Sequence, residues 1–254
     1  MLFASKPTKS GSRGRRSAVL LVMLMLTLMT TGCLYPDEKN EAKAINYRDS
    51  VSRIQAAVDA YQADKGLLPI LNANEDTPRY EKFRIDLSKL EQNGYLDEIP
   101  STAFEKGGNA YFLILDEELK PTVKVLDLIT MQKVTDVQRA VDRYKISNKG
   151  ALPSINEIYP GLFEVDLKKA GVTNSSLKSV YSGQEVAFLM DKQGKVYVDY
   201  AFDIMQLIDK EKIQPQPDED LRVYLEQSSY YVPVKSLPYQ WKDGSPVAVS
   251  EMEG

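Results

Sequence analysis

One segment of this chain occurs twice, and the repeat constrains the fold more than any other feature. Residues 51–61 (VSRIQAAVDAY) align with residues 134–144 (VTDVQRAVDRY), and six of the eleven positions are identical. Both copies lead into Lys-Gly and then a proline, at 65–69 and 149–153. A spacing of roughly 80 residues is longer than the period of solenoid repeats, so the pattern predicts two domain-sized units.

Two further pairs of matched blocks follow in the same order. Residues 83–87 (FRIDL) correspond to 163–167 (FEVDL), and residues 111–114 (YFLI) correspond to 187–190 (AFLM). Four matched blocks in one order indicate a tandem duplication.

The duplication divides the chain into five expected parts. We expect a leader, a tether, a first unit, a second unit and a C-terminal appendage. Their residue ranges are 1–32, 33–46, 47–128, 129–212 and 213–254.

The repeated segments have the spacing of amphipathic helices. In the first copy Val51, Ile54, Val58 and Tyr61 lie at i, i+3, i+7 and i+10, which places one apolar stripe on a helix. The second copy has the same spacing. The glycine that follows each stripe is a typical helix stop.

Each unit is then expected to continue with a short helix and a hairpin. Asp86 and Asp166 are predicted N-caps of short helices that end at Gly94 and Gly171. The apolar runs that follow predict antiparallel strand pairs, 111–115 with 123–126 and 186–190 with 196–200. The fold class is therefore α+β, with a helix, a short helix and a small antiparallel sheet in each unit. Units of this size bury little surface alone, so we expect them to pack together.

The first 33 residues have the pattern of an export signal. Residues 1–32 hold five basic and no acidic side chains, and residues 18–29 form an apolar run that ends shortly before Gly32 and Cys33. A basic start, a short apolar run and small residues predict a secretory signal peptide. The run is shorter than the about 20 residues that a membrane span needs. The segment resembles bacterial lipoprotein signals, which implies cleavage between Gly32 and Cys33 and a lipid on Cys33.

The composition restricts the chemistry. The chain has no histidine and one cysteine, which excludes Cys/His zinc sites and Ser-His-Asp or Cys-His catalysis. We therefore expect no metal and no cofactor. Carboxylate pairs remain possible, but three acidic positions recur between the units, which predicts structural roles on a helix face, at a cap and at a strand end. These pairs are Asp59/Asp142, Asp86/Asp166 and Asp127/Asp203.

Export also changes the net charge. Loss of five basic residues with the signal leaves 27 basic against 36 acidic residues, so the net charge moves from −4 to −9. Nucleic-acid binding depends on clustered Lys and Arg, so we expect no nucleic-acid partner.

The C-terminal appendage is rich in aromatic residues. A proline-containing linker at 213–217 precedes a helix expected around 218–227 and a hairpin with its turn at Asp243-Gly244. Two roles are open for the aromatic side chains: a stacking platform for a cell-wall glycan, or burial against the second unit. These side chains are Tyr230, Tyr231, Tyr239 and Trp241.

Two family resemblances follow from these residues. Gly32–Pro36 and the helix at 51–59 resemble the YphF-like lipoproteins of Bacillus-type bacteria over most of the chain. That resemblance implies a location and a lipid on Cys33, and it implies no reaction. The pattern from Tyr61 to residues 111–112 also resembles the soluble domain of type II secretion pseudopilins, although here a tether interrupts the helix that a pseudopilin keeps continuous.

The expected function is a non-enzymatic one at the cell membrane. We expect a lipoprotein, anchored by a palmitate-type lipid on Cys33 and facing outside the cytoplasm, that binds or assembles with a protein partner. The alternative is a receptor for a cell-wall glycan or peptide that uses the C-terminal aromatics. A carboxylate-dependent hydrolase and a pilus-related component are further alternatives.

Overall fold

The computed structural model describes residues 38–173 and 176–250. The chain divides into two compact parts, residues 1–45 and residues 46–254. Gly32 and Cys33 lie outside the described residues. Helix α2 (Glu38–Lys65) begins within the range expected as the tether and contains the first repeated segment. Within the described residues no helix combines the length and the apolar character needed to cross a membrane.

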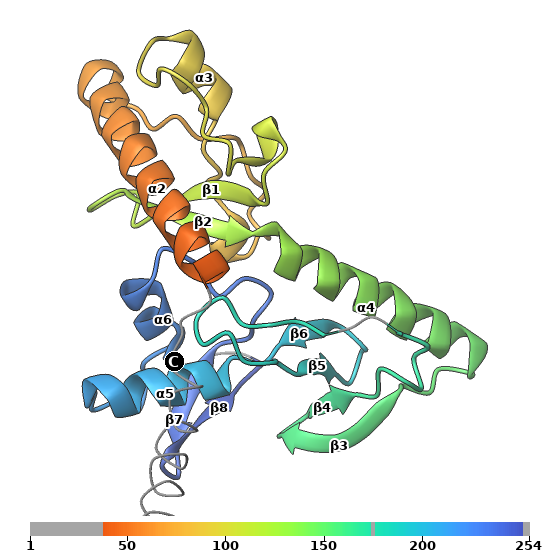
Figure 1. Cartoon of the computed structure of the whole chain (residues 1–254). Coiled ribbons are helices and arrows are strands. Elements are labelled where there is room, and N and C mark those ends of the chain that lie inside the picture. The colour runs from red at the N-terminus through yellow and green to blue at the C-terminus, as the bar shows by residue number, and fades with distance from the viewer. Residues whose placement is uncertain (1–37, 174–175, 251–254) are drawn as a thin grey trace, which may run out of the picture. The chain divides into compact units, whose positions relative to one another are not determined.

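The first unit pairs helix α2 with one hairpin (Figure 1). Strands β1 and β2 are antiparallel from Ala110↔Asp127 to Leu115↔Thr122, which confirms the predicted strand pair. The apolar stripe of α2 is buried with the inner face of this hairpin in one core cluster. The elements are α2, η1 (Arg79–Glu81), α3 (Leu87–Gln92), η2 (Phe104–Lys106), β1 (Ala110–Leu115) and β2 (Thr122–Asp127).

The second unit packs helix α4 on a four-stranded antiparallel sheet of order β3-β4-β5-β6 (Figure 1). The stripe of α4 is buried with this sheet and with α5 in a second core cluster. The α+β class predicted from the sequence is thereby confirmed. The elements are α4 (Leu128–Ser147), β3 (Ser154–Tyr159), β4 (Leu162–Val165), β5 (Phe188–Asp191), β6 (Val196–Val198) and α5 (Ala201–Glu211).

One predicted element is missing from the second unit. The carboxylate of Asp166 accepts a hydrogen bond from the N–H of Lys169 at 2.9 Å, as a helix cap does, but residues 167–171 form only a turn. In the first unit Asp86 caps α3 in the same way. The prediction of a second short helix is wrong because the stop glycine comes too early. Gly171, at φ 78°, follows its cap residue Asp166 by five residues, whereas Gly94 follows Asp86 by eight.

The glutamine that occurs in both copies of the repeated segment makes the same contacts in each unit. Gln55 Nε2 donates to Asp59 at 2.8 Å and to the carbonyl of Pro121 at 3.0 Å, while its Oε1 accepts from the N–H of Val123 at 2.7 Å. Gln138 makes the corresponding contacts in the second unit. These are with Asp142 at 3.0 Å, Gly194 O at 2.9 Å and Val196 N at 2.8 Å. In both units the glutamine ties the helix to the hairpin turn, which supports the interpretation of a tandem duplication.

The third recurring acidic pair does not share one role. Asp127 caps α4, accepting from the N–H of Thr130 at 2.8 Å and from its hydroxyl at 2.7 Å. Asp203 instead lies inside α5 and is buried. The predicted strand-end position is confirmed for Asp127, the last residue of β2, and is wrong for Asp203, because β6 ends at Val198 and Asp203 lies within α5.

The C-terminal residues form helix α6 (Arg222–Ser228) and the predicted hairpin, β7 (Tyr239–Lys242) with β8 (Ser245–Ala248). Between them runs a segment, residues 229–235, that we call the clasp. The N–H of Val125 donates to Tyr230 O at 2.7 Å, and the N–H of Val198 donates to Lys235 O at 2.8 Å. Val125 lies two residues after Val123, whose N–H donates to Gln55. Val198 lies two residues after Val196, whose N–H donates to Gln138. The clasp therefore connects the same position of both hairpins, rather than packing against the second unit alone.

Candidate binding groove

A groove with a volume of about 730 Å³ lies on the first unit. One wall is the exposed face of α2, another is β2, and the third is the end of α6 with the start of the clasp. We call it the α2 groove. Its polar lining residues include Arg48, Ser52, Asp59, Thr122 and residues 227–230.

The helix wall follows directly from the amphipathic pattern of α2. Val51, Ile54 and Val58 are buried against the hairpin, whereas Ser52 and Asp59 on the opposite face are exposed. Gln55 lies between these faces and its amide is committed to the hairpin turn. The wall is therefore fixed by hydrogen bonds on one side and open to a partner on the other.

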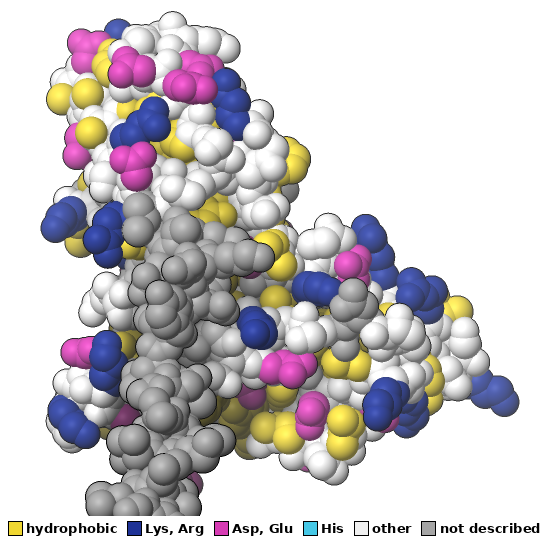
Figure 2. Space-filling view, in the orientation of Figure 1, with side chains coloured by type: hydrophobic (Ala, Val, Ile, Leu, Met, Phe, Trp, Pro, Cys, Tyr) yellow, Lys and Arg dark blue, Asp and Glu magenta, His cyan; other side chains and the backbone are white. Residues whose placement is uncertain are grey.

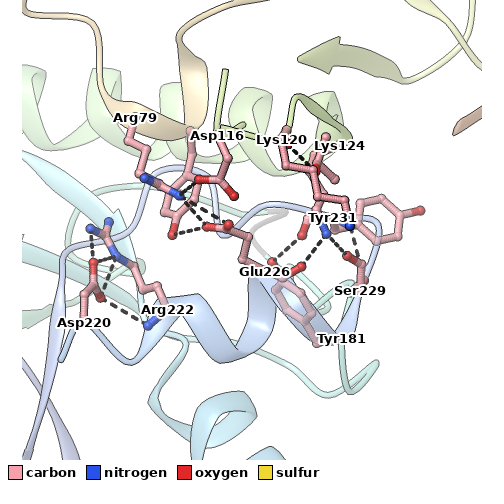
Figure 3. Close-up of polar contacts among 12 residues, drawn as sticks. Arg79, Asp116, Lys120, Lys124, Tyr181, Asp220, Arg222, Glu226, Ser229 and Tyr231 are labelled. Atoms are coloured by element: carbon pink, nitrogen blue, oxygen red, sulfur yellow. Dashed lines mark hydrogen bonds and ion pairs between the residues drawn. The ribbon is translucent and has the colours of Figure 1, made fainter. Parts of the chain in front are cut away.

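The wall opposite α2 is held by a buried carboxylate (Figure 3). Glu226 accepts from Arg79 Nη2 at 3.3 and 3.2 Å, and from the hydroxyl of Tyr80 at 3.2 Å. Its side chain is 7% exposed, and that of Arg79 is 53% exposed. A charge at this depth needs such partners, so the pair fixes α6 to the first unit.

Lys124 of β2 fixes the chain where α6 ends. Its ammonium group donates to the carbonyl oxygens of Glu226 at 2.5 Å and Ser229 at 2.8 Å (Figure 3). Burial lowers the pKa of Lys124, and the nearby carboxylates of Glu226 and Asp116 oppose this shift. Because the amine is committed to these carbonyls, it shapes the groove and is not free to act as its ligand.

Two guanidinium groups enclose the ring of Tyr80. Arg79 Cζ lies 5.8 Å and Arg222 Cζ lies 5.1 Å from the ring centre, within the range of cation–π attraction. Arg222 is in turn paired with Asp220 at 2.7 Å. Burial raises the pKa of Tyr80 well above its usual value, so its hydroxyl stays protonated and keeps donating to Glu226.

The structure does not bring the four predicted ligand-binding aromatics together. Tyr230 is 37% exposed and lines the α2 groove. Tyr231 packs edge-to-face on Tyr47 with ring centres 5.5 Å apart, and Trp241 packs half-buried against the core of the second unit.

Tyr239 is part of the protein core and cannot reach a ligand. It is fully buried, and its hydroxyl donates to Asp199 at 2.9 Å and accepts from the N–H of Tyr200 at 2.8 Å. A buried ring offers no face for stacking, so Tyr230 is the aromatic that can meet a ligand at the groove.

The groove lining is suited to hydrogen bonding. Among the described lining residues, seven of thirteen carry a hydroxyl or an amide, and the charged groups are the guanidinium of Arg48, the amine of Lys124 and the carboxylate of Asp59. Acidic and basic side chains are interspersed over the face shown in Figure 2. Among the described residues no three His, Cys, Asp or Glu side chains form a group that could hold a metal ion.

Sequence reasoning missed Glu226, Arg79 and Lys124. They come from segments far apart in the chain, and none belongs to a repeated block, so no local pattern marks them. The repeat holds a signal that could have identified Gln55, because a polar residue present in both copies beside an apolar stripe indicates a specific contact.

A comparison with known families gives one match. Residues 47–127 match the YphF family N-terminal domain. The range runs from α2 to the cap of α4, so the match covers the first unit and supports the expected YphF-like resemblance there. No curated protein and no solved structure matches the chain. The resemblance to pseudopilins and the lipid on Cys33 stay predictions.

Proposed function

We propose that this protein is a lipoprotein, anchored at Cys33 and facing outside the cytoplasm, that binds a protein partner in the α2 groove. The observation that carries the proposal is the groove itself, whose walls come from three chain segments and are fixed by the Arg79–Glu226 and Lys124 contacts. A wall fixed before binding lowers the entropy cost of association. Hydroxyl and amide groups that line the groove can form hydrogen bonds with the backbone of a polypeptide.

The anchor is proposed on the sequence pattern. Cys33 directly follows the proposed export signal, residues 1–32. Acylation with two chains at this cysteine would give stable attachment, which one chain does not. Cys33→Ser should abolish incorporation of radioactive palmitate and release the protein from the membrane fraction. Labelling that persists in this variant would contradict the anchor.

The partner role is tested by crosslinking in living cells. A photoreactive amino acid replaces Ser52 or Tyr230, which line the groove, or Ser88, an exposed serine of α3 outside it. The proposal expects both groove positions to capture the same protein and Ser88 to capture none of it. Capture of that protein from Ser88 as well, or of unrelated proteins from Ser52 and Tyr230, would contradict a defined partner.

A cell-wall polymer is the second candidate for the groove. The exposed ring of Tyr230 favours it, because an aromatic face can stack on a sugar. The full chain should then pellet with isolated cell wall, and Tyr230→Ala should reduce pelleting more than Trp241→Ala. Equal pelleting of all three proteins would exclude this role for Tyr230.

A further inference from the structure

Two residues of opposite charge lie along the helix wall of the α2 groove. Arg48 and Asp59 both line the groove and both are exposed. They belong to one face of α2, because positions 48, 52, 55 and 59 follow the spacing i, i+4, i+7 and i+11. A helix rises about 1.5 Å per residue, so the two residues are about 16 Å apart along its axis. The helix wall therefore carries a cation toward one end and an anion toward the other.

The other walls show which end of the groove is which. Tyr47, next to Arg48, packs edge-to-face on Tyr231 of the clasp with ring centres 5.5 Å apart. Gln55, one helical turn before Asp59, binds both that carboxylate and the hairpin turn. A segment that lies in the groove from the clasp toward the hairpin turn therefore meets the guanidinium first and the carboxylate last.

Both charges are available to a partner. Among the described residues Arg48 has no ion-pair partner, and Asp59 accepts a hydrogen bond from the neutral amide of Gln55 at 2.8 Å. The third charged lining residue is Lys124, whose ammonium group already donates to two backbone carbonyl oxygens of the α6 end. Arg48 and Asp59 are therefore the charged groups that a bound segment can pair with.

We propose that the protein segment bound in the α2 groove is extended and carries two charged side chains, an acidic one that pairs with Arg48 and a basic one that pairs with Asp59. The inference rests on the proposed function and names the chemistry of the partner. An extended chain rises about 3.3 Å per residue, so a span of about 16 Å corresponds to about five residues. Because side chains lean along the chain, the two charges lie roughly four to six positions apart.

The paired charges fix the direction of the bound segment. In one direction both ion pairs form, whereas in the other the like charges meet at both ends, which is repulsive. An exposed ion pair strengthens binding only up to about fivefold. The charges therefore select the partner and its direction more than they raise the affinity.

Peptide selection tests the pairing. A random peptide library displayed on phage is selected on the full chain in detergent, and the enriched peptides should carry an acidic and a basic residue roughly four to six positions apart, in a single order. Selection on Arg48→Glu should replace the acidic residue by a basic one, and selection on Asp59→Lys should replace the basic residue by an acidic one. Arg53→Glu and Asp64→Lys change exposed charges of the same helix outside the groove, and they should select the same peptides as the parent protein.

A binding measurement with one enriched peptide completes the test. Replacing its acidic side chain by the corresponding amide should weaken binding to the parent protein about two- to fivefold and should leave binding to Arg48→Gln unchanged. Three results would overturn the inference: enriched peptides without a common charge pattern, the same peptides from Arg48→Glu as from the parent protein, or an equal loss of affinity in the parent protein and in Arg48→Gln.

The crosslinking experiment separates this inference from the proposed function. Partner capture at Ser52 and Tyr230, together with peptides that lack the charge pattern, would refute the paired charges and leave the groove proposal standing. The charge pattern without capture in cells would support the paired charges and contradict the proposed partner.

Discussion

Replacing Glu226 by glutamine removes the charge on which the wall opposite α2 depends, while the shape of the side chain is kept. Glu226 accepts from Arg79 and Tyr80 and is 7% exposed. Removing one partner of a fully buried pair costs about 3–5 kcal/mol. Arg79 is 53% exposed, so water compensates it in part, and the amide oxygen still accepts one hydrogen bond. A hydrogen bond to a charged group is worth about 1.5–3 kcal/mol, and we expect a loss of about 2 kcal/mol in the free energy of unfolding.

Chemical and thermal denaturation of the full chain measures this loss. For a protein of this size, 1 kcal/mol corresponds to roughly 2–4 °C in Tm, so Glu226→Gln should lower Tm by about 4–8 °C. Glu118→Gln changes an exposed glutamate and should stay within about 0.5 kcal/mol of the parent protein. A double-mutant cycle with Arg79→Ala should show a coupling free energy of about 1 kcal/mol. Equal stability of Glu226→Gln and Glu118→Gln, or zero coupling, would contradict a stabilising ion pair between Glu226 and Arg79.

Three further predictions follow from buried polar contacts. Gln55→Ala and Gln138→Ala should each lower the free energy of unfolding by about 1–3 kcal/mol, because backbone groups of the hairpin turns lose their partners. Denaturation checks this, and a neutral effect in both variants would contradict a stabilising role for the glutamine contacts. Tyr239→Phe should cost a similar amount, because the N–H of Tyr200 and the carboxylate of Asp199 each lose a partner; denaturation checks this as well, and an unchanged stability would contradict the assigned bonds. Asp203→Asn should change the pH dependence of stability. The pKa of Asp203 is raised in the folded protein. The contribution of Asp203 to the free energy of unfolding is therefore fully present below the unfolded pKa of about 3.9. That contribution is lost as pH rises through the folded pKa. The asparagine variant should therefore gain stability relative to the parent at neutral pH and lose this advantage in acid. An advantage that is the same at all pH values would contradict the raised pKa.

The repeat and its periodicity made much of the fold predictable. The stripe at Val51, Ile54 and Val58 and the β1–β2 register are set by local patterns of period 3.6 and 2, which the sequence displays directly. The short helix after Asp166 was predicted wrongly, because a cap residue indicates where a helix begins and not that there is room for one before the next glycine.

The groove could not be predicted in the same way. Its shape depends on Glu226 meeting Arg79 across 147 positions of sequence, and on the clasp meeting Val125 and Val198. Such contacts follow from how the units pack, which no local pattern records. The aromatic pattern was ambiguous for the same reason: Tyr230 and Tyr239 are alike in sequence, yet one lines the groove and the other is core.

Photocrosslinking in living cells from Ser52, Tyr230 and Ser88 shows whether the partner binds in the α2 groove. We predict that one protein is captured from both groove positions and not from Ser88, and that capture falls in Glu226→Gln, where the groove wall is loosened. Capture that is equal at all three positions would contradict the claim that the α2 groove is where this protein binds its partner.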